Sequence, residues 1–130
     1  MANPRKKGSS GELEFCRWLK ETLDLDVTPK RNLELVRSGG ADVLDVEPYC
    51  FEVKRREKLD LFEAWSQVNF AAKELDAIPI VAFRMNRGKW QFLIPSYFLM
   101  TELNFGYIQL TEKVFRAWIK DHYRGFCERA

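Results

Sequence analysis

The chain has few of the residues on which several classes of site depend. It contains one histidine, His122, and three widely separated cysteines at positions 16, 50 and 127. A site that needs two histidines is therefore excluded, and the lack of a CxxC pair argues against structural zinc. We expect His122 on the surface without a role. An odd number of cysteines with no signal peptide is typical of a reducing compartment, so we expect a cytoplasmic protein.

Long apolar runs are also lacking. No segment approaches the roughly 18 residues that a transmembrane helix needs, so we expect no membrane partner. A length of 130 residues corresponds to one domain. The hydrophobic fraction of 46% and the aromatic fraction of 14% suit a globular chain with its own core. We interpret residues 1–130 as a single domain in which residues 1–7 form a flexible basic arm.

Positive charge is clustered along the chain, although the net charge is only +2. The clusters lie at residues 5–7, 30–31 and 55–58. Side chains of this kind can follow DNA phosphates and give salt-dependent affinity, or they can be solvated surface charge. From the clusters and a neighbouring position we take as candidate DNA contacts Lys7, Arg31, Arg37, Arg55 and Arg56.

Hydrophobic periodicity predicts helices over residues 8–23, 59–75 and 111–123, and strands over residues 25–31, 41–46, 49–55, 78–83 and 89–94. In the first helix Glu12 lies within the apolar stripe, whereas Glu14 faces away as an ordinary surface residue. The two strands around Glu47 and Pro48 are predicted to form a β-hairpin. The later strand–helix–strand crossover predicts an α/β fold, a mixed β-sheet flanked by helices.

The strand over residues 49–55 carries the candidate chemistry. Alternation places Glu52 and Lys54 on one face, and closure of the hairpin brings Asp42 towards Glu52. Adjacent carboxylates repel each other unless a cation neutralises them, and Mg²⁺ prefers carboxylate oxygens and water. A neighbouring lysine can orient water and stabilise charge on a phosphate, so the three residues predict metal-assisted phosphodiester hydrolysis. The competing interpretation is a salt bridge on an edge strand.

Asp42 followed by Glu52-Val53-Lys54 resembles the D-Xn-E-X-K motif of PD-(D/E)XK nucleases. Lys-Gly-Ser-Ser-Gly-Glu at residues 7–12, together with residues 31–42, 78–84 and 89–92, resembles archaeal and phage-encoded Holliday junction resolvases. The resemblance covers roughly residues 7–95 and implies a restriction-endonuclease-like core. The chain departs from the archaeal pattern in two ways. The gap between the two acidic residues is short, spanning residues 43–51, and Leu13 replaces an arginine.

The resemblance implies particular roles for the motif residues. Asp42 and Glu52 would be metal ligands, with the Val53 carbonyl completing the set. Glu12 would reach the metal site from the first helix, and Lys54 would position the attacking water. The alternative for Glu12 is a buried glutamate that pairs with a lysine or caps a loop.

Two further residues are assigned by the same resemblance. Ser38 would contact the scissile phosphate, and Gln67 would contribute to catalysis from the flank of the second helix. The alternatives are a turn serine at position 38 and a solvent-facing glutamine at position 67.

The resemblance implies a Mg²⁺-dependent endonuclease that acts on DNA, with Mn²⁺ as a substitute metal and no organic cofactor. Its most specific form is a Holliday junction resolvase, in the host cytoplasm if the protein is phage-encoded. Two symmetric cuts call for a two-fold protein, so we expect a homodimer, joined through residues 98–105 or the last helix. The alternatives are another structure-selective, nicking or repair nuclease of this superfamily, a non-catalytic DNA-binding module on the same fold, and a metal-dependent RNA nuclease.

Overall fold

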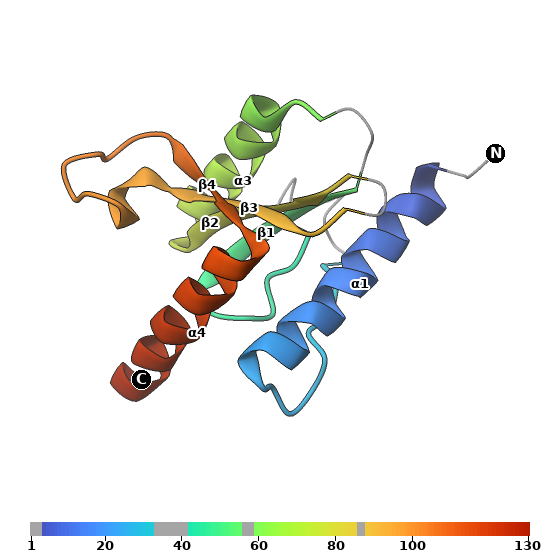
Figure 1. The fold of residues 1–130 in the computed structure, drawn as a ribbon, viewed down its shortest axis with the longest axis horizontal. Coiled ribbons are helices and arrows are strands. Elements are labelled where there is room, and N and C mark those ends of the chain that lie inside the picture. The colour runs from blue at the N-terminus through green and yellow to red at the C-terminus, as the bar shows by residue number, and fades with distance from the viewer. Residues whose placement is uncertain (1–3, 33–41, 56–58, 86–87) are drawn as a thin grey trace.

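The computed structural model describes residues 4–32, 42–55, 59–85 and 88–130, with only the backbone of residues 4–9. In chain order (Figure 1) the elements are α1 (Pro4–Leu23), β1 (Tyr49–Arg55), α3 (Leu61–Leu75), β2 (Ile78–Arg84), β3 (Gln91–Pro95), the 3₁₀ turn η1 (Ser96–Phe98), β4 (Tyr107–Thr111) and α4 (Glu112–Arg129). None of the helices in these ranges is long and apolar enough to cross a membrane.

The sheet within the described residues has the strand order β1-β2-β3-β4. β1 and β2 are parallel and are joined through α3, whereas β2–β3 and β3–β4 are antiparallel. The prediction of an α/β fold with a mixed sheet flanked by helices is therefore confirmed. Within the described residues one strand lies between α1 and α3, where the prediction placed three, and three strands lie between α3 and α4, where the prediction placed two.

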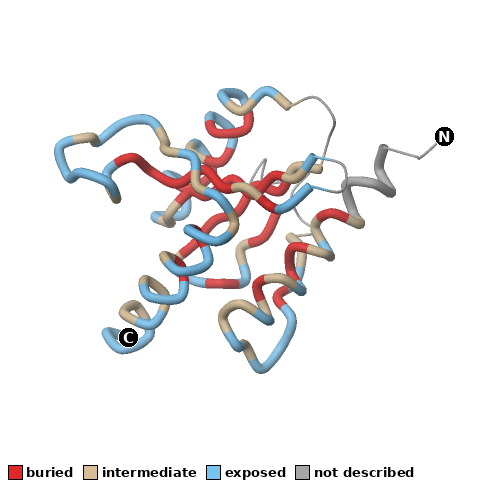
Figure 2. The backbone as a smooth tube through the Cα atoms, in the orientation of Figure 1, coloured by how far each residue is buried: buried red, intermediate tan, exposed pale blue. Residues whose placement is uncertain are grey.

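The helices cover both faces of the sheet, and the strands are buried between them (Figure 2). One core lies between the sheet and the helices α1 and α4, and its members include Phe15, Leu19, Phe51, Phe92 and Phe115. The other core lies under α3 and includes Trp65, Val68, Val81 and Leu93. Because β1 alternates between the two cores, its polar residues are held at defined places in the sheet.

Side-chain caps set two of the helix starts. Asp60 accepts a hydrogen bond from the Glu63 N–H at the start of α3, and Thr111 accepts one from the Val114 N–H at the start of α4. These bonds satisfy N–H groups that have no partner within the helix. α3 therefore begins at Leu61, two residues after the predicted start.

Several predicted boundaries differ from the structure. α1 begins at Pro4, four residues early, so the predicted basic arm overlaps the first turn of this helix. α4 continues to Arg129 rather than ending at residue 123. β4 was not predicted, because its five residues are too few to show a clear period. The predicted strand over residues 25–31 is absent from the structure, and Pro29 within it cannot donate to a ladder.

The predicted hairpin is reduced to one isolated bridge, between Val43 and Phe51. The backbone N–H groups of Asp42 and Val43 both donate to the Phe51 carbonyl, at 2.8 and 3.2 Å. Two residues opposite one is the pattern of a β-bulge, which bends the strand and redirects a side chain. The expected strand over residues 41–46 was therefore wrong, although residues 42 and 43 do lie against β1.

Candidate functional site

Asp42 is fixed against the outer edge of β1. Its Oδ2 accepts a hydrogen bond from the Val53 N–H at 2.7 Å, and its carbonyl accepts one from the Asn32 N–H at 2.7 Å. Since β1 is the edge strand of the sheet, its outward N–H groups are available for such contacts. The residue is only 4% exposed, so its carboxyl group is both buried and held in place beside the Val53 backbone.

Glu52 and Lys54 lie next to each other on β1. Cys50 packs under α3, so strand alternation places Glu52 and Lys54 on this same face. The Lys54 Nζ lies 3.1 Å from the Glu52 Oε1. Glu52 is 7% exposed, so water stabilises its carboxylate poorly. The nearby ammonium group of Lys54 stabilises the negative charge of Glu52 instead.

Glu12 reaches the same place from α1. Its carboxyl group lies within hydrogen-bonding reach of that of Asp42, and its Oε2 lies 3.5 Å from the Arg31 Nη1. The Asp42 carboxyl group is also within hydrogen-bonding reach of that of Glu52. Three carboxyl groups from α1, the bulge and β1 therefore form a continuous row, which we call the acidic row (Glu12, Asp42 and Glu52).

The acidic row holds more negative charge than its surroundings stabilise. Burial, followed by the charge of Glu52, raises the pKa of Asp42 from 3.8 to about 7. Burial, followed by the charge of Asp42, raises the pKa of Glu12 from 4.5 to about 7. Burial also raises the pKa of Glu52, against the opposing effect of Lys54. The row must therefore take up protons or a cation near neutral pH.

The residues of the acidic row fit a hard divalent cation by their chemistry. Within the described ranges, no group of three or more His, Cys, Asp or Glu side chains is already spaced to hold a metal ion. Mg²⁺ does not require three protein side chains, because it is often bound through one or two carboxylates and keeps several waters. Asp42 and Glu52 could supply such a pair, with the Val53 backbone directly beside Asp42.

Several other predicted site residues lie away from the acidic row or outside the described part of the chain. Gln67 is exposed on α3, and the described contacts include no hydrogen bond or ion pair between it and the three carboxyl groups. Ser38, Arg37 and Arg56 lie outside the described residues. The backbone of Lys7 lies in α1, and its side chain is outside the described part.

Glu14 is not the ordinary surface residue that the helical pattern predicted. Its Oε1 lies 2.8 Å from the Arg55 Nη1, and its Oε2 lies 2.8 Å from the Arg84 Nη2. The candidate DNA contact Arg55 is therefore already paired. The helical pattern of α1 could not show this, because the partners come from the ends of β1 and β2.

His122 also differs from its prediction as a surface residue. It is partly buried, with its Nδ1 2.6 Å from the Tyr49 hydroxyl group. Its ring stacks on that of Trp118, with 4.9 Å between the centroids. The residue therefore links α4 to the start of β1.

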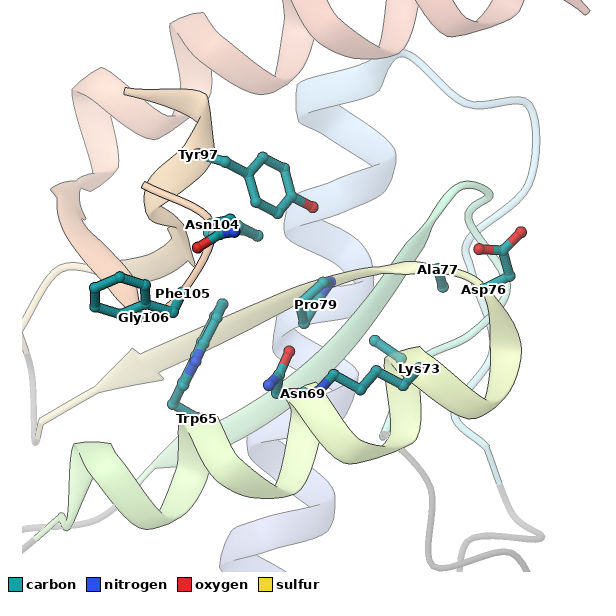
Figure 3. A pocket seen from close by; sticks show the side chains of 12 residues that line it. Trp65, Asn69, Lys73, Asp76, Ala77, Pro79, Tyr97, Asn104, Phe105 and Gly106 are labelled. Atoms are coloured by element: carbon teal, nitrogen blue, oxygen red, sulfur yellow. The ribbon is translucent and has the colours of Figure 1, made fainter. Parts of the chain in front are cut away.

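A cavity of about 420 Å³ lies between α3 and the segment that follows β3 (Figure 3). Trp65, Asn69 and Lys73 line it from α3, and Tyr97 and Phe105 line it from the other side. No residue of the acidic row and none of the other predicted site residues lines this cavity. It is therefore separate from the candidate site.

Comparison with known proteins gives one similar fold to report. No family model matches the chain, and no curated protein matches it. Among solved structures it is similar to Hjc of the archaeal hyperthermophile Archaeoglobus fulgidus, a Holliday junction resolvase. The identity is 19%, the match covers 83% of this chain and 86% of Hjc, and the TM-score is 0.49. Likeness at this level does not establish a shared activity, so the functional proposal rests on the site.

Proposed function

We propose that the chain is a divalent-metal-dependent DNA endonuclease with a PD-(D/E)XK core. The observation that carries the proposal is the acidic row beside Lys54, whose Nζ lies 3.1 Å from Glu52. Mg²⁺, or Mn²⁺ in its place, would act as a Lewis acid and lower the pKa of a bound water. Asp42 and Glu52 would hold the metal, together with the Val53 carbonyl and Glu12.

The protein's own groups have distinct tasks in this proposal. The Val53 N–H fixes the orientation of Asp42, so this ligand is in place before substrate arrives. Lys54 is restrained by Glu52 and would orient the attacking water and stabilise charge on the phosphate. Ser38 would contact the scissile phosphate, and Gln67 would contribute from α3, as the sequence resemblance implies.

The competing interpretation, a salt bridge on an edge strand, accounts for only part of this geometry. The contact between Glu52 and Lys54 is what such a salt bridge predicts. It does not account for Asp42 and Glu12, whose pKa values are raised to about 7 in the same place. A row of carboxyl groups with raised pKa values, two of them buried, is typical of a functional site rather than of a stabilising contact.

We propose four-way junction DNA as the substrate, because the sequence resembles Holliday junction resolvases over residues 7–95. Other structure-selective, nicking or repair nucleases share the same chemistry and differ in the DNA they cut. A non-catalytic DNA-binding module would bind DNA and leave it intact. A metal-dependent RNA nuclease would cut RNA faster than DNA.

We further propose that the active form is a homodimer. Two symmetric cuts in a two-fold substrate require two equivalent sites. The segment between η1 and β4 exposes Leu99, Met100 and Phe105, the last at 77%. Exposed apolar side chains within one short segment are typical of interaction surfaces, and a second copy is the partner that the substrate symmetry calls for.

The test is cleavage of a synthetic four-way junction and a matched linear duplex, with Mg²⁺ or with chelator. The variants are Lys54→Ala and Asp42→Asn, and the matched control is Lys73→Ala, an exposed lysine on α3. We expect metal-dependent cutting of the junction, lowered about 100-fold or more by either site variant and unchanged by the control.

Each other outcome has a defined meaning. Equal cutting of junction and duplex would retain the nuclease and reject the resolvase. DNA binding without any cutting would indicate the non-catalytic module. Cutting that persists in chelator, or in Asp42→Asn, would reject the metal site proposed here.

A further inference from the structure

Two arginines stand side by side at the ends of the parallel strands β1 and β2. Arg55 and Arg84 are direct partners in the register of these strands. Both bind the carboxylate of Glu14 on α1, each at 2.8 Å. Among the described residues neither arginine has a second carboxylate partner, so one positive charge in this cluster is not neutralised.

The two guanidinium groups are held in place from several sides. A Cβ on Gly11 would lie 3.1 Å from the Arg55 Cβ, so only glycine lets α1 approach the Arg55 stem this closely. The Arg84 guanidinium carbon lies 5.3 Å from the centre of the Trp90 ring. Such restraint lowers the entropy that each side chain would lose on binding a ligand.

Both arginines retain the capacity to bind an anion. Each guanidinium has five N–H donors, and the contact with Glu14 occupies one nitrogen of each group. Arg55 and Arg84 are 24% and 22% exposed. Paired guanidinium groups of this kind match the oxygens of a phosphate.

The cluster is built on two elements, α1 and β1, that also carry the candidate site. Arg55 follows Lys54 on β1, where it lies on the opposite face of the strand, and Glu14 lies two residues after Glu12 on α1. We propose that Arg55 and Arg84 bind a backbone phosphate adjacent to the one that is cleaved, and that Glu14 is the positioning residue that orients both. This inference rests on the proposed function, and it adds Arg84 and Glu14 to the residues that serve it.

The alternative is that the ion pairs only fasten α1 to the sheet. The salt dependence of DNA affinity separates the two, because each phosphate contact contributes about 1 to the slope of log affinity against log salt. An ion pair with a purely structural role contributes to stability but not to this slope.

The experiment measures binding of fluorescent duplex and junction DNA by anisotropy, in chelator, over a range of KCl concentrations. Arg84→Gln is compared with Arg124→Gln, a matched control on α4 that removes one arginine from an exposed pair with Asp121. We expect Arg84→Gln to lower the slope by about 1 and the affinity by roughly three- to tenfold. The control should change neither quantity.

Arg84→Lys supplies a second test, because it keeps the charge and removes the planar group. We expect an unchanged salt slope and a weaker affinity. If wild-type protein binds no DNA, the proposed function itself fails. If wild-type protein binds and Arg84→Gln keeps the full slope, the phosphate subsite is wrong. If Arg84→Gln does not fold, Arg84→Lys alone decides the matter. A DNA affinity equal to that of the wild type in Arg84→Lys would then reject the proposal that two guanidinium groups bind the phosphate.

Discussion

At the scale of single residues, the site is dominated by the cost of burying Asp42. Its carboxyl group is removed from water, lies beside Glu52 and gains one backbone hydrogen bond in return. Because these effects raise its pKa to about 7, the charged form destabilises the metal-free protein. Residues that serve a reaction often have such a cost, and their replacement often raises stability.

We therefore expect Asp42→Asn to raise the Tm of the chelated protein at pH 8. The folded-state pKa of Asp42 is raised, so its favourable contribution is present below pH 4 and is lost as the pH rises through about 7. The gain in Tm should be a few degrees at pH 8 and smaller at pH 5. Thermal unfolding at both pH values checks this, with Asp26→Asn, an exposed aspartate, as control. A lower Tm than wild type at pH 8 would contradict it.

His122 affects stability in the opposite sense to Asp42, because its contribution is lost as the pH falls. Burial, followed by the charge of Arg129, lowers its pKa below 6.5. The neutral ring is thus favoured in the fold, and stability is lost as the pH falls from 6.5 through the folded-state value. We expect the Tm difference between wild type and His122→Gln to shrink between pH 7.5 and pH 5.5. Parallel pH profiles for the two proteins would show that His122 does not titrate differently on unfolding.

At the scale of elements, the position of α1 on the sheet matters most. This helix brings Glu12 to Asp42 and Glu14 to the two arginines. Gly11 is where it approaches β1, so the size of this residue controls the docking of the helix and, with it, both clusters.

Two glycine-to-alanine changes should therefore have opposite effects. Glycine in a helix costs up to about 1 kcal/mol relative to alanine, so Gly125→Ala in α4 should be stabilising, since its nearest neighbour is the flexible end of Arg129 at 3.3 Å. Gly11→Ala should be destabilising, because the new Cβ meets the Arg55 Cβ at 3.1 Å. Chemical denaturation of both variants measures the difference. Equal stabilisation would show that α1 shifts without cost.

For the molecule as a whole, the exposed apolar segment between η1 and β4 bears on whether two copies of the chain associate. The segment between η1 and β4 presents Phe105 beside the cavity under α3 (Figure 3). Its ring is largely exposed in the single chain, which is consistent with the proposed dimer.

We expect wild-type protein to sediment as a dimer and Phe105→Asp to sediment as a monomer. A charge at this position would be removed from water on association, at a high energetic cost. Val27→Asp is the matched control, because Val27 is also an exposed apolar residue but lies in the segment after α1. A monomeric wild type would reject the dimer, and a dimeric Phe105→Asp would place its interface elsewhere.

Features that depend on local periodicity could be predicted from the residues alone. Alternation along residues 49–55 was enough to place Glu52 beside Lys54, and the crossover through residues 59–75 was enough to predict a mixed sheet. The position of Glu12 in an apolar stripe also indicated that its side chain faces the sheet.

Contacts between distant segments followed instead from the way the elements pack. Glu14 pairs with Arg55 across 41 positions of the chain, and Tyr49 bonds to His122 across 73 positions. The bulge at Asp42 depends on a local shift of the backbone. Periodicity reports which face of an element is apolar, but the partner of each polar group is set by how the elements pack. For this reason the sequence predicted the members of the acidic row, whereas the arginine cluster became visible only in the fold.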